Sequence, residues 1–349
     1  MRLLAAVKAA AYGHGAVEIS RAAVLAGADY LGVASYEEGV ELRQAGIMAP
    51  ILVFGAFTPA AAVPAIGHQL TATVSSANEA RALADAARAQ KGVVRVHVKT
   101  DTGMTRLGVR GMPATLSLLE AVSDMPGIML EGLYTHYAAA DELDGAFTDR
   151  QRQRFEEIVL QARRAGVVIP IVHAANSAGT LRGPEHHYDM VRPGIALYGY
   201  HPAPAWRQDI DLRPVLALKT RIVRLADIEP GETVSYGYTY TAKQRVTIAT
   251  LPIGYADGIP RALSNVGTVC VNGQPARIAG RVCMDQMMVE VPGNTVHVGD
   301  EVTVYGCSGD CGSLSAAALQ LDTIPYELLC RISARVPRIT RAQKNNEET

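Results

Sequence analysis

The chain has 349 residues, which is long enough for two domains. Hydrophobic residues make up 48% of it and charged residues 19%, proportions that exclude a disordered or highly charged chain. The formal net charge of −1 gives no electrostatic reason to expect a nucleic acid or a membrane surface as partner, and no apolar run reaches the roughly 20 residues that span a bilayer.

The first 200 residues alternate short runs of β-branched residues with stretches rich in Ala, Glu and Arg. Apolar residues recur three or four positions apart in these stretches, as in helices that cover a sheet. Regular alternation of strand and helix is typical of a parallel sheet, and eight units favour a TIM-type (β/α)8 barrel. The expected strands are Leu3–Lys8, Tyr30–Ser35, Ile51–Phe54, Thr71–Ser75, Val93–Thr100, Met129–Tyr137, Ile171–Asn176 and Met190–Tyr198, and the expected helices include Val17–Ala26, Tyr36–Ala45, Ala77–Gln90, Pro113–Ser123 and Asp149–Ala165.

The start of the chain departs from this regular pattern. The first expected strand begins almost at Met1, and no helix is left over to close the ring after the helices between strands are assigned. A barrel of eight strands normally has eight helices. Either the last helix comes from elsewhere in the chain, or the N-terminal part of the barrel is missing, which is what the family resemblance described below implies.

The pattern changes near Pro214, where helical stretches give way to β-rich runs separated by turns at Pro230-Gly231 and Asn272-Gly273. This spacing predicts a compact all-β domain with one short helix at Ser315–Leu321. We expect the barrel to occupy residues 1–212 and the C-terminal β-rich domain residues 213–349. The expected β-rich runs are Val215–Leu225, Val246–Leu251, Gly267–Val271, Met287–Val291 and Glu301–Tyr305.

All five cysteines lie in the last quarter of the chain, at positions 270, 283, 307, 311 and 330. An odd number in a chain of this size argues against a disulfide framework and favours reduced thiols in the cytoplasm. Cys307 and Cys311 lack the spacing and the second pair of a zinc site, so we expect no metal and interpret both as small buried hydrophobic residues.

Polar residues gather where the expected barrel strands end, which is where functional residues cluster in this fold. Lys8 ends the first strand and is followed by Gly13 and Gly15. The later strand ends carry Lys99–Arg106, Tyr134–His136, His173, Asn176 and Ser177, and Arg192–Ile195.

These residues allow two interpretations of Lys8. A lysine at a strand end is by itself typical of a rim side chain that reaches water. A lysine desolvated among cations loses its proton more readily and can form a Schiff base with an aldehyde, and the nearby glycines and the ring of Arg, His and Tyr favour this interpretation. Ser177 and the backbone of Gly194-Ile195 could bind a phosphate, as late loops do in many barrels.

Eight segments in their order along the chain resemble the alanine racemases, which are pyridoxal-phosphate (PLP) enzymes of fold type III. One such segment alone would be weak, but the eight together are specific and cover nearly the whole chain. They are VKAAAYGHG at Val7–Gly15, KTDTGMTRLG at Lys99–Gly108, HAANSAGT at His173–Thr180, VRPGIALYG at Val191–Gly199, VSYGYTYTA at Val234–Ala242, IGYADG at Ile253–Gly258, RVCMDQ at Arg281–Gln286 and IPYE at Ile324–Glu327.

The resemblance implies that Lys8 holds PLP as a Schiff base and serves as one catalytic base, while Tyr236 is the other. Tyr236 would act across the interface of a homodimer. Arg192 would face the pyridine nitrogen, and Arg106 would bond the phenolic oxygen of the cofactor and contact the substrate. The phosphate would be held by Tyr12, Ser177, Gly194, Ile195 and Tyr326.

The resemblance assigns supporting roles to further residues. His136 would bridge Tyr236 and Arg192, so that a cationic chain stabilises the phenolate. Met284 would meet the substrate carboxylate through its backbone, with Tyr255 and Asp285 near the entrance. Lys99 matches the carbamylated lysine of the family, which would orient Arg106.

The implied chemistry requires these residue types. Racemisation removes the α-proton from one face and returns a proton to the other, so two bases must flank a planar carbanion that PLP stabilises. An arginine opposite the pyridine nitrogen does not give up its proton. The nitrogen then stays unprotonated, and Arg192 therefore favours racemisation over transamination.

The sequence leaves several functions open. The resemblance implies a cytoplasmic alanine racemase that supplies D-alanine for peptidoglycan precursors. A broad-specificity, serine or basic amino-acid racemase would share the fold and the chemistry. A non-catalytic PLP-binding protein would lack the β-domain, and a decarboxylase of this fold class is disfavoured by the same segments. Position 10 is alanine where the family commonly has a polar residue, but this position transfers no proton.

Overall fold

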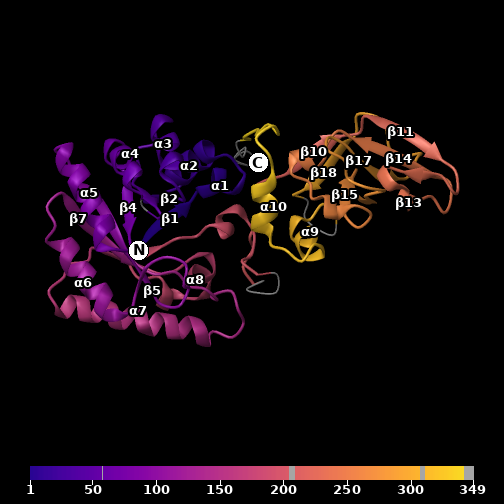
Figure 1. The fold of residues 1–349 in the computed structure, drawn as a ribbon. Helices are drawn as coiled ribbons and strands as arrows, with labels where there is room; N and C mark the ends of the chain where they lie inside the picture. The colour runs from indigo at the N-terminus through magenta and orange to yellow at the C-terminus, as the bar shows by residue number, and fades with distance from the viewer. Residues whose placement is uncertain (57, 204–208, 307–310, 342–349) are drawn as a thin grey trace, which may run out of the picture. The chain divides into compact units, whose positions relative to one another are not determined.

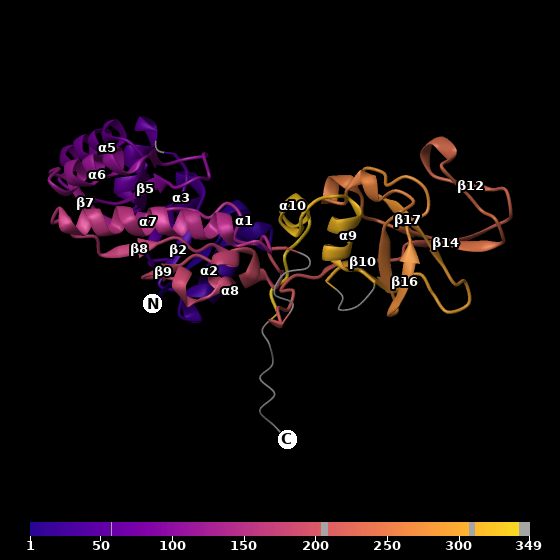
Figure 2. The same cartoon turned by 90° about the horizontal axis from the view of Figure 1, so that it is seen from below.

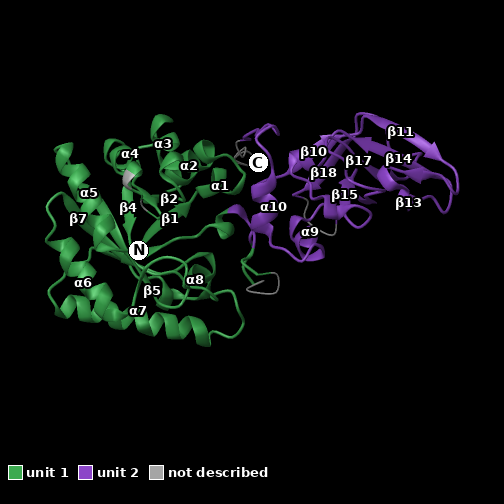
Figure 3. Ribbon diagram, viewed as in Figure 1, with its two compact units in different colours: residues 1–197, 201–211 green, residues 198–200, 212–349 purple. Residues whose placement is uncertain are grey.

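The computed structural model describes residues 1–56, 58–203, 209–306 and 311–341. The chain divides into two compact units (Figure 3). Unit 1 contains residues 1–197 and 201–211, and unit 2 contains residues 198–200 and 212–349. Cys307 lies outside the described residues, so the interpretation of its side chain remains a prediction.

Unit 1 is built around eight parallel strands (Figure 1). Neighbouring strands follow the order β8-β7-β5-β4-β3-β2-β1-β9, and a short ninth strand, β6 (Val109–Arg110), pairs with β5. Consecutive βα units thus place each strand beside the previous one, as in a TIM-type barrel. The eight strands are β1 (Arg2–Ala6), β2 (Tyr30–Val33), β3 (Ile51–Val53), β4 (Thr71–Val74), β5 (Val94–Asp101), β7 (Ile128–Tyr134), β8 (Ile171–His173) and β9 (Met190–Val191).

The ring closes where β9 lies between β8 and β1. Arg2 pairs with Met190 in the parallel register of β1 and β9. On the other side, the amide of Asp189 donates to the carbonyl of Val172, and the amide of Arg192 donates to Ala175. The strands therefore form a nearly closed barrel, and the predicted TIM-type barrel is confirmed.

Helices cover the outside of the strands, and the five predicted helices are present within one to three residues of their expected bounds. Figure 2 shows α7, with 19 residues the longest of the set, lying along the outside of unit 1. In the described part of the chain, no helix is long and apolar enough to cross a membrane. The helices that follow the first seven barrel strands are α2 (Ala16–Leu25), α3 (Tyr36–Gln44), α4 (Ala62–Gly67), α5 (Ala77–Ala89), α6 (Met112–Ser123), α7 (Ala146–Arg164) and α8 (Ser177–Arg182).

Local sequence signals explain where these helices begin. Ser35 accepts a hydrogen bond from the amide of Glu38, and the Glu38 side chain returns to the Ser35 amide, which is a capping box at the start of α3. Ser76 caps α5 by accepting a hydrogen bond from the amide of Glu79. Inside the ring, alternate residues of each strand point to one face. Five of them form one buried apolar cluster: Leu4, Tyr30, Leu52, Ile171 and Met190.

Unit 2 is dominated by antiparallel strands, and the predicted C-terminal all-β domain is confirmed. One sheet has the order β10-β18-β15-β16, a second has the order β11-β14-β17, and β12 pairs with β13. The strands are β10 (Leu218–Arg221), β11 (Arg224–Ile228), β12 (Thr233–Val234), β13 (Tyr240–Thr241), β14 (Val246–Leu251), β15 (Thr268–Val271), β16 (Gln274–Arg277), β17 (Met287–Val291) and β18 (Glu301–Tyr305), and two helices follow, α9 (Leu314–Gln320) and α10 (Pro325–Arg331).

Several expected strands extend two or three residues too far, among them those that end at Lys8, Tyr137 and Asn176, and two others differ more. The run predicted at Met190–Tyr198 is a strand only as far as Val191, and Ile195–Tyr198 is a 3-10 helix. Pro193 has no amide hydrogen for a strand ladder, so the strand ends before it. The run predicted at Val215–Leu225 covers β10 and only the first two residues of β11, and these two strands belong to different sheets.

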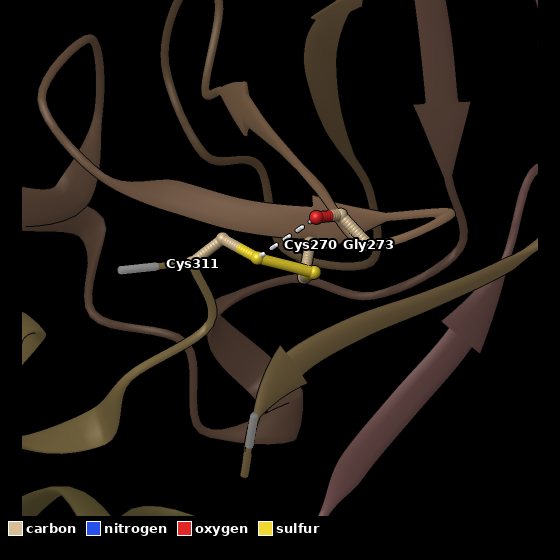
Figure 4. The surroundings of a disulfide bond; sticks show 3 residues. All are labelled: Cys270, Gly273 and Cys311. Carbon is tan, nitrogen blue, oxygen red and sulfur yellow. Dashed lines mark hydrogen bonds between the residues drawn. A yellow bond between two sulfur atoms is a disulfide. The ribbon is translucent and has the colours of Figure 1, made fainter. Parts of the chain in front are cut away.

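The prediction that all cysteines are reduced is also wrong. Cys270, on β15, and Cys311 form a disulfide with a distance of 5.0 Å between their α-carbons (Figure 4). The interpretation of Cys311 as only a small hydrophobic residue is corrected accordingly, although the residue is buried. Forty-one positions separate the two residues in sequence, and only the packing of the β-domain brings them together.

Candidate active site

The lysine singled out in the sequence lies directly after β1, at a turn of unusual backbone. The four residues that follow Lys8, Ala9–Tyr12, all have φ between 52° and 54°. This left-handed conformation costs an L-residue about 1–2 kcal/mol. Strain of this kind persists only where the surroundings enforce it, and it concentrates at functional sites. The backbone thus supports a functional role for the segment that presents Lys8.

Neighbouring elements hold this turn in place. The amide of Val7 donates to the carbonyl of Gly32, at 2.8 Å, which continues the pairing of β1 with β2. The amide of Ala9 donates to Oε1 of Glu38 at 2.6 Å. Since Glu38 also forms the capping box of α3, the Lys8 turn is fixed to the first turn of that helix.

A group of cations surrounds the mouth of the barrel next to Lys8. Lys99, at the end of β5, is 5% exposed. Burial, together with the charges of Arg106, Arg192 and Lys8, lowers its pKa to about 7. A large fraction of Lys99 is therefore in the neutral amine form near neutral pH. Asp101, the acid of the same strand, forms its ion pair with Arg110 at 3.6 Å.

Arg192 is the most deeply buried of these cations, with 4% of its surface exposed. Its guanidinium donates to the carbonyls of Thr135 and Ala174, both at 2.9 Å, and to Nδ1 of His173 at 2.8 Å. Burial lowers its pKa to about 10, so the group remains charged at neutral pH. Four donor contacts, the last to Nδ1 of His136 at 3.3 Å, fix the orientation of this charge.

His136 is neutral in this environment. Burial lowers its pKa well below the ordinary value, and the charges of Arg192 and Arg106 act in the same direction. Because a guanidinium can only donate, Nδ1 of His136 accepts from Arg192 and the ring proton lies on Nε2. The sequence predicts a cationic chain through both residues, whereas in the structure the positive charge belongs to Arg192.

Small residues and hydroxyls form a cradle beside Lys8. Oγ of Ser177, at the start of α8, accepts hydrogen bonds from the amides of Gly194 at 2.8 Å and Ala196 at 3.3 Å. A Cβ added to Gly194 would lie 2.4 Å from Oη of Tyr12. Glycine is thus required for the approach of these segments, and four of the five expected phosphate residues, Tyr12, Ser177, Gly194 and Ile195, lie in unit 1.

The other expected residues lie in unit 2, where three turns meet. Tyr236 is 73% exposed and begins a 3-10 helix, Tyr236–Tyr238. Oγ of Ser235 donates to the carbonyl of Arg281 at 2.7 Å, which joins this turn to the segment that carries Met284. The amide of Tyr255 donates to the carbonyl of Cys283 at 2.9 Å. Tyr236, Tyr255 and Met284 therefore form one exposed edge of unit 2.

Two further expected residues belong to unit 2. Tyr326, predicted to bind phosphate, lies on α10, a helix that the sequence pattern did not reveal. Asp285, expected near the entrance, accepts from Nη2 of Arg335 at 2.8 Å, and the same arginine binds Asp257. The first unit thus holds the lysine and the buried arginine, and the second holds the candidate tyrosine base.

Sequence reasoning missed one aromatic residue inside the barrel, His97, and gave no role to Tyr134 and His173, which it placed at strand ends. The centroid of the Tyr134 ring lies 5.3 Å from Nζ of Lys99 and 5.2 Å from Cζ of Arg192. Both cations therefore lie near the same aromatic ring. His173 stacks on it at 4.7 Å and contacts His97. A signal for His97 was present, since it lies two residues before Lys99 on one strand and therefore on the same face.

The fold and the site together define a class of protein. It is a TIM-type barrel enzyme that presents a lysine after its first strand and a buried arginine after its last, and it continues into a β-domain with an exposed tyrosine edge. Two family models match the chain: "Alanine racemase, N-terminal domain" over residues 1–202 and "Alanine racemase, C-terminal domain" over residues 215–340.

Individual relatives agree with the family models. The chain is 45% identical to "Alanine racemase 1" of Oceanobacillus iheyensis, over 97% of this chain and 90% of the relative. It is 43% identical to an alanine racemase of Synechocystis sp., over 97% of this chain and 91% of the relative. The solved alanine racemase of Clostridium difficile 630 superimposes with a TM-score of 0.92 at 39% identity, covering 96% of this chain and 88% of that one. The chain belongs to the alanine racemase family.

Proposed function

We propose that the chain is an alanine racemase that uses PLP to interconvert L-alanine and D-alanine. Membership of the family supports this function, and one observation in the structure carries it: Lys8 is held on a strained turn at the barrel mouth, where its charge and that of Arg192 both lower the pKa of Lys99. We further propose a cytoplasmic homodimer that supplies D-alanine for peptidoglycan precursors. This location now rests on the family alone, because two of the five cysteines are paired.

The residues of unit 1 fit the proposed cofactor. PLP combines an aldehyde, a pyridine ring and a phosphate, and the barrel mouth offers a lysine amine, a buried guanidinium and a cradle that a Cβ at Gly194 would fill. Lys8 would bind the aldehyde and Arg192 would face the ring nitrogen. Arg106 would bond the phenolic oxygen. Within this unit, the phosphate would be held by Tyr12, Ser177, Gly194 and Ile195.

The side chains of the protein perform the proton transfers. When bound, PLP supplies an electron sink that acidifies the α-carbon of an amino acid joined to it. The amine of Lys8 takes or returns the proton on one face, and the phenolic oxygen of Tyr236 of the partner subunit does so on the other. Arg192 keeps its own protons and leaves the ring nitrogen unprotonated. The backbone at Met284 and the side chain of Arg106 orient the substrate carboxylate.

Substrate choice is tested by measuring racemisation of single enantiomers across a panel of amino acids. We expect kcat/KM for alanine to exceed that for serine, lysine and arginine. A pocket that fits a methyl group excludes longer side chains through steric overlap. We therefore expect kcat/KM values to differ by about a hundredfold. Equal turnover of alanine and lysine would contradict the assignment to alanine and favour a broad-specificity racemase.

We also propose that Lys99 carries a carbamate. Its pKa of about 7 leaves roughly nine-tenths of the amine neutral at pH 8, whereas an ordinary lysine is almost fully protonated there. The neutral nitrogen attacks the carbon of CO2, a C–N bond forms, one C–O π pair moves onto oxygen, and the nitrogen proton leaves to water. The resulting anion would compensate Arg106 and Arg192.

The carbamate is tested with 13C-labelled bicarbonate. We expect a carbamate resonance in the 13C NMR spectrum of the protein at pH 8, and we expect Lys99→Met to lack it. Lys99→Glu restores a negative charge and should recover more activity than Lys99→Met. A wild-type spectrum without the resonance, or one that Lys99→Met leaves unchanged, would contradict the proposal.

A further inference from the structure

A line of buried polar groups leads from Arg192 into the middle of the barrel. Nη1 of Arg192 lies 2.8 Å from Nδ1 of His173, and Nε2 of His173 lies 2.8 Å from Nδ1 of His97. Nε2 of His97 then lies 3.2 Å from Oε2 of Glu131. Both histidines are fully buried, and the Glu131 side chain is 14% exposed. Four groups from separate segments of the chain thus form one continuous row.

The two end groups of this row, Arg192 and Glu131, determine which nitrogen of each imidazole ring carries the proton. The guanidinium of Arg192 can only donate, so Nδ1 of His173 accepts and its ring proton lies on Nε2. That N–H points at Nδ1 of His97, which must accept in turn, so the proton of His97 lies on Nε2 and is donated to Glu131. Burial lowers the pKa of both rings, which keeps both neutral. Each ring therefore has one tautomer that satisfies both neighbours.

The surrounding residues are shaped to hold the two rings. A Cβ on Gly132 would lie 2.6 Å from Nδ1 of His97. The backbone of Gly132 is not left-handed, so the space for the imidazole is the reason for glycine there. On the other side, Tyr134 stacks on His173 with an interplanar angle of 9°. The row is therefore a specific arrangement with little room for alternative ring positions.

Glu131 provides the negative end of the row. Burial acts to raise its pKa, but hydrogen bonds from His97 and Tyr30 and the charge of Arg95 outweigh it, and the pKa is lowered overall. Oγ1 of Thr71 donates to it at 3.3 Å. Among the described residues no carboxylate pairs with Arg192 directly. Glu131 is therefore connected to this buried cation through the two neutral imidazoles.

We propose that Glu131 and His97 are positioning residues for Arg192. They select the tautomer of His173 that presents a bare nitrogen to the guanidinium, and they thereby hold the guanidinium in one orientation. The inference rests on the proposed function, in which Arg192 faces the cofactor. Glu131, which is separated from Arg192 by two histidines, then controls the orientation of the Arg192 guanidinium.

The first test is a 15N NMR measurement on the PLP-loaded wild-type protein labelled at histidine. The ring nitrogens report which atom carries the proton, and we expect Nε2–H for both His97 and His173. Assignment uses His97→Gln. A proton on Nδ1 of either ring would overturn the proposal, and this measurement depends on no variant at Glu131. It is also independent of turnover, so it stands apart from the test of alanine racemisation.

The second test compares Glu131→Leu with Glu131→Gln, using Glu120→Leu as a control at an exposed glutamate of α6. Leucine removes the acceptor, so we expect the His97 proton to move to Nδ1 and His173 to turn its N–H toward Arg192. Loss of one hydrogen bond to a charged group, about 1.5 kcal/mol, corresponds to roughly a tenfold fall in kcat. KM for alanine should change less than kcat.

Glutamine keeps an oxygen acceptor, so Glu131→Gln should retain the wild-type tautomers and most of kcat. If Glu131→Leu folds and leaves both the ring protons and kcat unchanged, the proposal is wrong. If the wild type neither binds PLP nor racemises alanine, the proposed function fails, while the tautomers of His97 and His173 still decide the hydrogen-bonded row.

Discussion

Replacing Lys8 by alanine should abolish both racemisation and the visible absorbance of a lysine-linked cofactor. Lys8 offers the amine at the barrel mouth that can bind the aldehyde, and the same amine is needed to move the proton on one face of the substrate. Loss of a proton-transfer group costs about 10²–10⁴-fold, and loss of the covalent attachment adds to this. The measurements are the absorbance spectrum of the PLP-loaded protein and the rate of L-to-D conversion of alanine.

Lys91→Asn provides a matched control for this substitution. Lys91 is an exposed lysine on the turn before β5, with φ of 54°, a conformation that asparagine tolerates. We expect this variant to keep the spectrum and the activity of the wild type. An unchanged visible band in Lys8→Ala would show that another group binds the aldehyde, and the assignment of Lys8 would then be wrong.

Replacing Tyr236 by phenylalanine should separate the two faces of the reaction. Phenylalanine keeps the ring and removes the oxygen that we assign as the second base. Proton exchange of one enantiomer of alanine with solvent deuterium should fall about 10²–10⁴-fold, and exchange of the other enantiomer should persist through Lys8. Net racemisation must fall equally in both directions, since the two enantiomers have the same free energy. The α-proton exchange of each enantiomer is therefore the quantity to measure.

Tyr238→Phe is the control for this experiment. Tyr238 ends the same 3-10 helix and is 76% exposed, similar to Tyr236, but has no assigned role. We expect both exchange rates of Tyr238→Phe to match the wild type. If Tyr236→Phe slows the exchange of both enantiomers to the same extent, the two-base model is excluded.

Much of the fold followed from the sequence because the strands of a barrel have strong local signals. The runs that became β2, β3 and β4 begin at their predicted first residues, since each is a short apolar segment between turn residues. The end of the last barrel strand was placed wrongly because Pro193 and the closed ring decide it together. Helices α4 and α8 have only six residues, too few to show a helical period.

The site could be predicted only in part, for physical reasons. Residues at strand ends are placed by the barrel itself, so Lys99, His136 and Arg192 could be expected at one rim. The disulfide between Cys270 and Cys311 depends on contacts between segments distant in sequence. The tautomers of His97 and His173 depend on a hydrogen-bond partner at each end, and a residue pattern contains no information about proton positions.

The left-handed turn at Ala9–Tyr12 has a consequence for the order of folding. Four residues at about 1–2 kcal/mol each place roughly 4–8 kcal/mol of strain in this turn, an amount comparable with the net stability of a whole domain. An isolated segment with this sequence would relax to ordinary backbone angles. Val7 bonds to β2 and Ala6 to Pro193 beyond β9, so contacts from both ends of the ring enforce the turn. A newly synthesised chain therefore acquires the backbone geometry that presents Lys8 only when the last barrel strand has joined the first.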